Sequence, residues 1–77
     1  MPDWKTKNRF RRMKNLLRSY DRIVSSGEAL HTKDIVLWLL EEALSPYRYE
    51  PLDEETLIKR AREAVQEYEK KYGVIPL

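Results

Sequence analysis

Residues 33–44 read KDIVLWLLEEAL, and this stretch decides the fold. Read as a helix at about 100° per residue, its apolar side chains cover more than half of the helix circumference. A helix that is apolar on so many sides must be buried from several directions. We therefore predict a central second helix, with Trp38 buried against the first or the third helix or at a subunit contact.

The residues on either side of this stretch predict two longer helices, at about 3–25 and about 54–72. In both, apolar residues recur at the three- and four-residue spacing of an amphipathic helix. The predicted fold class is all-α, and residues 1–77 are expected to form a single domain. That domain is a compact three-helix arrangement whose second helix, at about 33–44, is central and buried.

Several residues are of types that favour the beginning or the end of a helix. Asp3 suits the start of the first helix, and Gly27 is a good stop for it. Thr32 is expected to be the N-cap of the second helix and Asp53 the N-cap of the third. Gly73 is expected to end the third helix.

The net charge of +2 at pH 7 conceals a strong segregation of charge along the chain. Residues 1–27 carry eight basic and two acidic side chains, whereas residues 28–58 carry two basic and eight acidic ones. Residues 59–77 have a net charge of +2. Such asymmetry is typical of a basic face that binds nucleic acid. The alternative is that the basic segment lies against the acidic one within the fold.

On the first predicted helix, five basic residues fall within an arc of roughly 80°. This basic stripe consists of Lys7, Arg11, Lys14, Arg18 and Arg22. Five like charges on one arc repel one another, so the stripe indicates an external anionic partner. Side chains at this spacing can meet a line of phosphates, and Arg adds bidentate hydrogen bonding. Further polar residues flank the stripe: Lys5, Asn8, Arg9, Arg12 and Asn15.

The helix-turn-helix motif requires a polar, basic recognition helix. The second predicted helix is instead apolar with Glu41 and Glu42, and the third interleaves Lys and Arg with Glu. The first helix is therefore the expected contact element. The predicted function is that of a small non-enzymatic protein, nucleic-acid-associated or regulatory, which contacts the phosphates of DNA or RNA through its first helix.

A stiff aromatic loop follows the second helix and contains Tyr47, Arg48 and Tyr49. Aromatic residues flanking an Arg can stack on unpaired bases or anchor a protein interface, and a Tyr here could also fold under to cap the core. The alternative function is that of a protein–protein interaction adaptor. Helix two and this loop would form its working surface, and the basic first helix would suit an acidic protein partner.

Catalysis is not expected from this composition. His31 is the sole histidine, there is no cysteine, and two glycines cannot build a phosphate-binding glycine loop. Adjacent acids such as Glu41 and Glu42 point about 100° apart on a helix and do not converge on one ion. We therefore predict no enzymatic activity, no cofactor and no metal site.

Seventy-seven residues without a disulfide build only a marginal core. Self-association into a homodimer would cover the excess apolar surface of helix two. The alternative is that four apolar residues fold back and close the core within one chain: Tyr47, Tyr49, Val74 and Ile75. The apolar run 35–40 is far shorter than the ~20 residues that span a bilayer. These features predict a cytoplasmic protein without a membrane partner.

Overall fold

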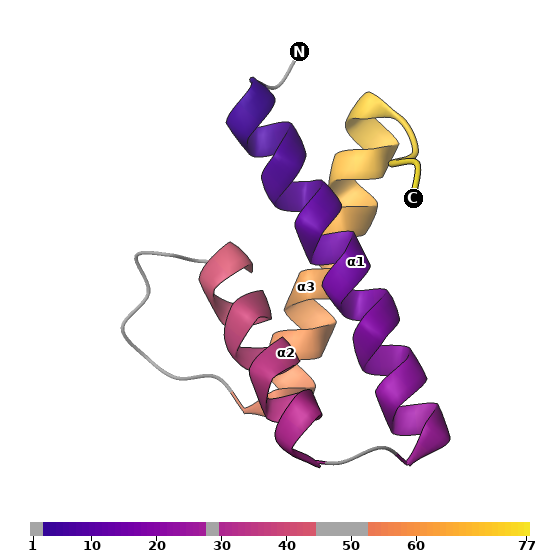
Figure 1. Cartoon of the computed structure of the whole chain (residues 1–77). Coiled ribbons are helices and arrows are strands. Elements are labelled where there is room, and N and C mark those ends of the chain that lie inside the picture. Colours follow the sequence, from indigo (N-terminus) through magenta and orange to yellow (C-terminus); the bar gives the residue numbers. More distant parts are fainter. Residues whose placement is uncertain (1–2, 28–29, 45–52) are drawn as a thin grey trace.

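Three helices account for the regular secondary structure of the described residues in the computed structural model (Figure 1). α1 spans Trp4–Ser26, α2 spans Leu30–Leu44 and α3 spans Glu54–Tyr72. Each helix packs against both others, and α1 packs most extensively against α2. The predicted all-α, compact three-helix fold is confirmed. The structure describes residues 3–27, 30–44 and 53–77.

α1 and α3 run antiparallel, so the N-terminal half of α1 lies beside the C-terminal half of α3 (Figure 1). Phe10 of α1 stacks on Tyr68 of α3, with ring centroids 4.5 Å apart. α2 is shorter than α1 and α3, and it ends before the end of the molecule at which both chain termini lie (Figure 1). That end is therefore built mainly from α1 and α3.

Local sequence explains the ends of α1 and the start of α3. The Asp3 carboxylate accepts a hydrogen bond from the Thr6 N–H at 2.8 Å, and Asp53 accepts one from the Thr56 N–H at 3.4 Å. Both residues are N-caps, which confirms the prediction for Asp53 and places Asp3 at the start of α1. Gly27 ends α1 with a φ of 70°, a left-handed conformation that glycine adopts without steric cost.

The predicted N-cap of α2 is wrong. α2 already begins at Leu30, so Thr32 lies within its first turn. The residues around this boundary differ in helix propensity by only a few tenths of a kcal/mol each, which is too little to fix where a helix begins.

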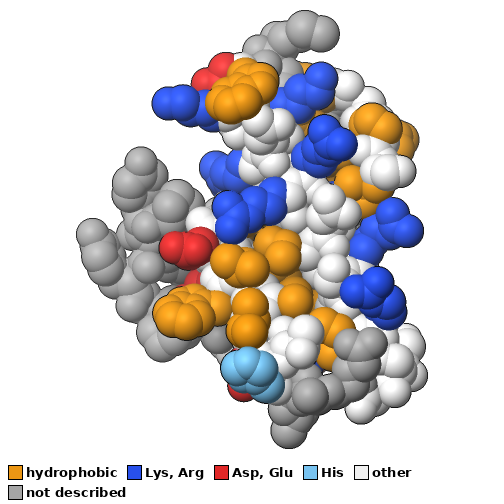
Figure 2. Space-filling model, viewed as in Figure 1, with side chains coloured by type: hydrophobic (Ala, Val, Ile, Leu, Met, Phe, Trp, Pro, Cys, Tyr) orange, Lys and Arg blue, Asp and Glu red, His pale blue; other side chains and the backbone are white. Residues whose placement is uncertain are grey.

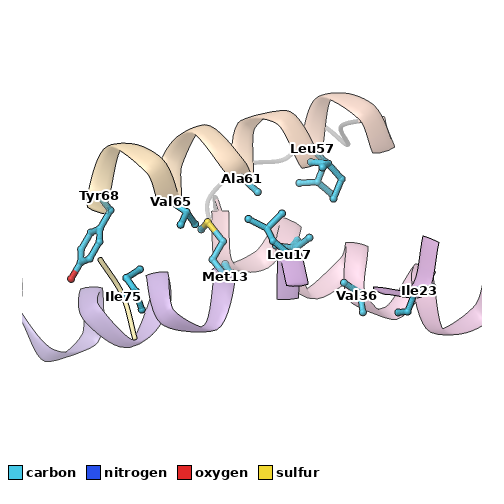
Figure 3. Close-up of a cluster of buried hydrophobic side chains, with 12 residues drawn as sticks. Met13, Leu17, Ile23, Val36, Leu57, Ala61, Val65, Tyr68 and Ile75 are labelled. Carbon is cyan, nitrogen blue, oxygen red and sulfur yellow. The ribbon is translucent and has the colours of Figure 1, made fainter. Parts of the chain in front are cut away.

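The core lies between the three helices and is apolar (Figure 3). Met13 of α1 and Leu40 of α2 are fully buried, and no buried polar or charged side chain occurs in the described part of the chain. Ile75 of the C-terminal tail is also buried and belongs to the same apolar cluster as Met13 and Tyr68 (Figure 3). Ile75 therefore closes one end of the core, as the alternative to self-association expects, whereas Val74 is exposed. The other buried side chains are Leu17, Ile23, Val36, Ala43, Leu57, Ile58, Ala61, Val65 and Tyr68.

The expected burial of α2 from several directions is not shown by the residues that the structure describes. α2 buries Val36, Leu40 and Ala43, but Ile35 is 44% exposed and Trp38 is 73% exposed. In a three-helix arrangement each helix meets two neighbours, so one side of each stays open. Trp38 lies about 160° around the helix from Leu40, on that open side.

Candidate nucleic-acid interface

The basic stripe lies on α1, and the packing of α1 decides which way it faces. Met13, Leu17 and Ile23 turn one side of the helix into the core. The opposite side therefore faces solvent, and Figure 2 shows Lys and Arg side chains distributed along α1 on one face of the molecule. Four stripe residues, which we call the outward cations, are exposed on this side: Lys7, Arg11, Arg18 and Arg22.

Lys14 is the stripe residue that does not belong with these four. Its Nζ donates to Glu69 Oε2 at 2.7 Å and to the carbonyl oxygen of Ile75 at 2.8 Å. Glu69 Oε2 also accepts a hydrogen bond from the Ile75 N–H at 2.7 Å. The hydrogen bonds from Lys14 and from the Ile75 backbone hold the pKa of Glu69 below its ordinary value. Lys14 therefore fixes the C-terminal tail to α1 and α3, rather than facing a ligand.

The outward cations are not neutralised by the acidic segment 28–58 within the part of the chain that the structure describes. The ion pairs there join Lys14 to Glu69, Lys33 to Glu54, and Arg62 to Asp21. None of these pairs connects the basic stripe with residues 28–58.

Asp21 is the only acidic residue within Trp4–Ser26, and it lies beside Lys14 and Arg18, at the edge of the stripe that faces α3. Its carboxylate accepts a bidentate pair of hydrogen bonds from Arg62 of α3, at 2.5 and 3.2 Å. The hydrogen bonds that Arg62 donates to Asp21 raise the pKa of Arg62 above its ordinary value. Asp21 is therefore paired with α3 at this edge, and the other exposed charged residues of α1 are all basic.

Arg9 has a structural role that its place beside the stripe does not reveal. Its Nε donates to the carbonyl oxygen of Ala43 at 2.6 Å, and its Nη2 donates to that of Leu44 at 3.1 Å. These are orphan carbonyls at the C-terminal end of α2, where the helix dipole favours a cation. Arg9 thus caps α2 while remaining part of the basic surface.

Trp4 is the residue that sequence reasoning missed. It is 74% exposed and lines a groove together with Lys5, Asn8 and Arg12 of α1. A signal was available, since Trp4, Asn8 and Arg12 follow one another at four-residue intervals and so share one ridge of a helix.

The second predicted site, Tyr47–Arg48–Tyr49, lies outside the described residues, so its role stays a prediction. The described residues contain no group of three or more His, Asp and Glu placed to hold a metal ion. Among the helices that the structure describes, none has the length and apolarity needed to cross a membrane.

Comparison of the chain with models of protein families, with curated proteins and with solved structures finds no match.

Proposed function

We propose that this chain is a small non-enzymatic protein, nucleic-acid-associated or regulatory, whose helix α1 binds the phosphates of DNA or RNA. The observation that carries the proposal is the single sign of the outward face of α1. Lys7, Arg11, Arg18 and Arg22 are exposed there, and no described acidic residue pairs with them.

The spacing of these cations suits a polyanion. At a rise of about 1.5 Å per residue, Lys7 and Arg22 lie roughly 22 Å apart along the helix axis. Double-stranded DNA carries one charge per about 1.7 Å of its axis, so several phosphates lie within that length. Binding would relieve the mutual repulsion of the cations and release counterions from the nucleic acid.

Neutral side chains on the same side of α1 add to this surface. Asn8 and Asn15 are exposed between the cations, and both line a shallow depression together with Arg11 and Arg12. Amide side chains donate hydrogen bonds to phosphate and sugar oxygens without adding charge. The surface therefore offers both charge and hydrogen-bond donors to a sugar–phosphate backbone.

Charge reversal at two outward cations tests the proposal. We expect R11E/R18E to lower the affinity for a labelled 20-nucleotide oligonucleotide about 100-fold or more at low salt, because two attractive contacts become repulsive. The matched control is K59E/R60E on α3, where both residues are also exposed. Both variants change the net charge equally, so the comparison isolates the position of the charges. We expect the affinity of the control to stay within a few-fold of that of the unmodified chain, because Lys59 and Arg60 lie on α3. Fluorescence anisotropy measures binding, and circular dichroism verifies folding.

Two results would contradict the proposal. Equal losses in the two variants would mean that overall charge, rather than the face of α1, governs binding. No measurable affinity of the unmodified chain for DNA or RNA at low salt would remove the proposal altogether.

The second candidate function is protein interaction through α2. The observation that favours it is the open side of this helix, where the exposed Ile35 and Trp38 are flanked by Asp34 and Glu42. Exposed Trp residues are enriched at interface centres. If this side joins two copies, sedimentation equilibrium should give a mass above 9.3 kDa that falls on dilution. Trp38→Ala should then give a monomer, whereas an unchanged mass in the variant would exclude α2 as the contact.

A further inference from the structure

Trp4 stands at the beginning of the basic surface and is exposed without packing into the core. It is the first residue of α1, directly after the Asp3 N-cap. Its ridge on α1 continues through Asn8 to Arg12, so the indole is in line with hydrogen-bond donors and a cation. An aromatic plane followed by such groups is a typical arrangement for a nucleotide, which has a base and a phosphate.

This ridge forms one wall of a groove, and the C-terminal end of α2 contributes the other wall. The groove has a volume of ≈ 540 Å³, within the range of roughly 300–1,000 Å³ that small-molecule sites occupy. Lys5, Arg9 and Arg12 line it, and Glu42 is the acidic residue among the lining residues. The groove is therefore predominantly cationic.

The position of Arg9 in this groove is fixed before any ligand arrives. Its two hydrogen bonds to the carbonyl oxygens of Ala43 and Leu44 hold the guanidinium at the end of α2. A guanidinium has five N–H donors, so this anchoring leaves three for a ligand. A charge that is already held in place loses less conformational entropy on binding.

We infer that this groove binds an unpaired nucleobase stacked on Trp4, with neighbouring phosphates on Lys5 and Arg12, so that single-stranded nucleic acid is the preferred ligand. This inference rests on the proposed function, because it assigns a class of nucleic acid to the same helix. In a duplex the faces of the bases are already stacked on one another. An unpaired base can turn its face to an aromatic ring, and any of the bases serves.

The groove is continuous with the outward face of α1. Asn8 and Arg12 line the groove and also the shallow depression that contains Arg11. A strand with one base on Trp4 would therefore extend along α1 toward the outward cations. The groove selects the unpaired base, and the outward cations hold the backbone that follows it.

Tryptophan fluorescence tests the inference, with Trp38→Phe leaving Trp4 as the single reporter. We expect oligo(dT) and oligo(rU) of 12 nucleotides to quench Trp4, and a 12-base-pair duplex at the same phosphate concentration to quench it little. Trp4→Ala should lower the affinity for the single strands about 5- to 100-fold, because base stacking is lost. The affinity for the duplex should stay within about twofold, because duplex contacts are made by charge.

Trp38→Ala is the matched control, since it removes an equally exposed Trp from α2, and we expect its affinities to be unchanged. Quenching of Trp4 by oligo(dT) or oligo(rU), together with a lower single-strand affinity of Trp4→Ala, supports the inference. Equal quenching by the duplex, or single-strand affinity unchanged in Trp4→Ala, overturns it but leaves phosphate binding by α1 intact. A different result would contradict the proposed function itself, namely that the unmodified chain binds neither single-stranded nor double-stranded nucleic acid.

Discussion

The outward faces of α1 and α3 differ in how their charges are arranged, although both helices bury one apolar side in the same core. The exposed charged residues on the outward face of α1 are all basic. On α3 the two signs alternate, since exposed Lys59 and Arg60 are followed by exposed Glu63 and Glu67 and then by Lys70. A face of mixed sign compensates its own charges. A face of one sign accumulates repulsion that an external anion can relieve, so the arrangement of charge is more informative than its amount.

Adding acidic residues to the outward face of α1 gives it mixed signs like those of α3, and this change should strongly lower the affinity for nucleic acid. N15E/S19E places two carboxylates three or four residues from Arg11, Arg18 and Arg22, where they form pairs within the helix. We expect the affinity for a 20-nucleotide oligonucleotide to fall about 30-fold or more, because the pairs compete with phosphates. The thermal midpoint should be unchanged or slightly raised. The uncharged control N15Q/S19Q should bind normally, and normal binding by the charged variant as well would refute the difference between the two faces.

Lys14 and Arg18 separate the structural part of the stripe from the outward part. We expect Lys14→Gln to lower the free energy of unfolding by about 1–2 kcal/mol, since it removes partly buried hydrogen bonds to Glu69 and Ile75. Arg18→Gln should leave stability nearly unchanged and weaken binding instead. Urea denaturation and anisotropy measure the two effects. If Lys14→Gln instead weakened binding and left the free energy of unfolding unchanged, the structural role of Lys14 would be contradicted.

The same contact gives a dependence of stability on pH. Because the folded-state pKa of Glu69 lies below its ordinary value, its contribution is fully present above that value. The contribution is lost as the pH falls through the folded-state pKa. We therefore expect the difference in unfolding free energy between the unmodified chain and Glu69→Gln to be largest near pH 7 and to shrink below about pH 4.5. If this difference in unfolding free energy were constant from pH 7 to pH 3, the charge of the Glu69 carboxylate would not contribute to stability.

The smallest effect is expected at the ion pair between Arg62 of α3 and Asp21 of α1. Both side chains are substantially exposed, at 42% and 54%, so solvent screens their attraction. Arg62→Gln should change the free energy of unfolding by no more than about 0.5 kcal/mol. A loss of 2 kcal/mol in urea denaturation would mean that this pair, rather than the apolar core, holds α1 and α3 together.

Local signals in the sequence were sufficient for much of the fold. Asp53 stands directly before the predicted third helix, where its carboxylate can accept a hydrogen bond from a backbone N–H of the first turn. It is the N-cap of α3. Gly27 likewise predicts a helix stop, because glycine alone adopts its conformation without steric cost. The periodicity of the stripe predicts one solvent-facing side of α1, and Lys7, Arg11, Arg18 and Arg22 lie there.

The sequence pattern is insufficient where tertiary contacts decide the position of a side chain. Trp38 belongs to an apolar helix, but the number of neighbouring helices determines how many of its sides are covered, and a sequence pattern does not contain that number. Lys14 has the spacing of the stripe, but it lies at the edge that faces α3, where Glu69 and the tail reach it. Arg9 binds carbonyl oxygens 34 and 35 residues away. No local rule anticipates such contacts.

The dependence of binding on salt tests the central claim most directly, because it counts the phosphates that α1 neutralises. With four outward cations, log K for a DNA duplex plotted against log[salt] should have a slope between about −3 and −4. R11Q/R18Q should make that slope shallower by roughly two, and K59Q/R60Q should leave it unchanged. A slope shallower than about −1, or equal slopes in all three proteins, would contradict binding through the outward face of α1.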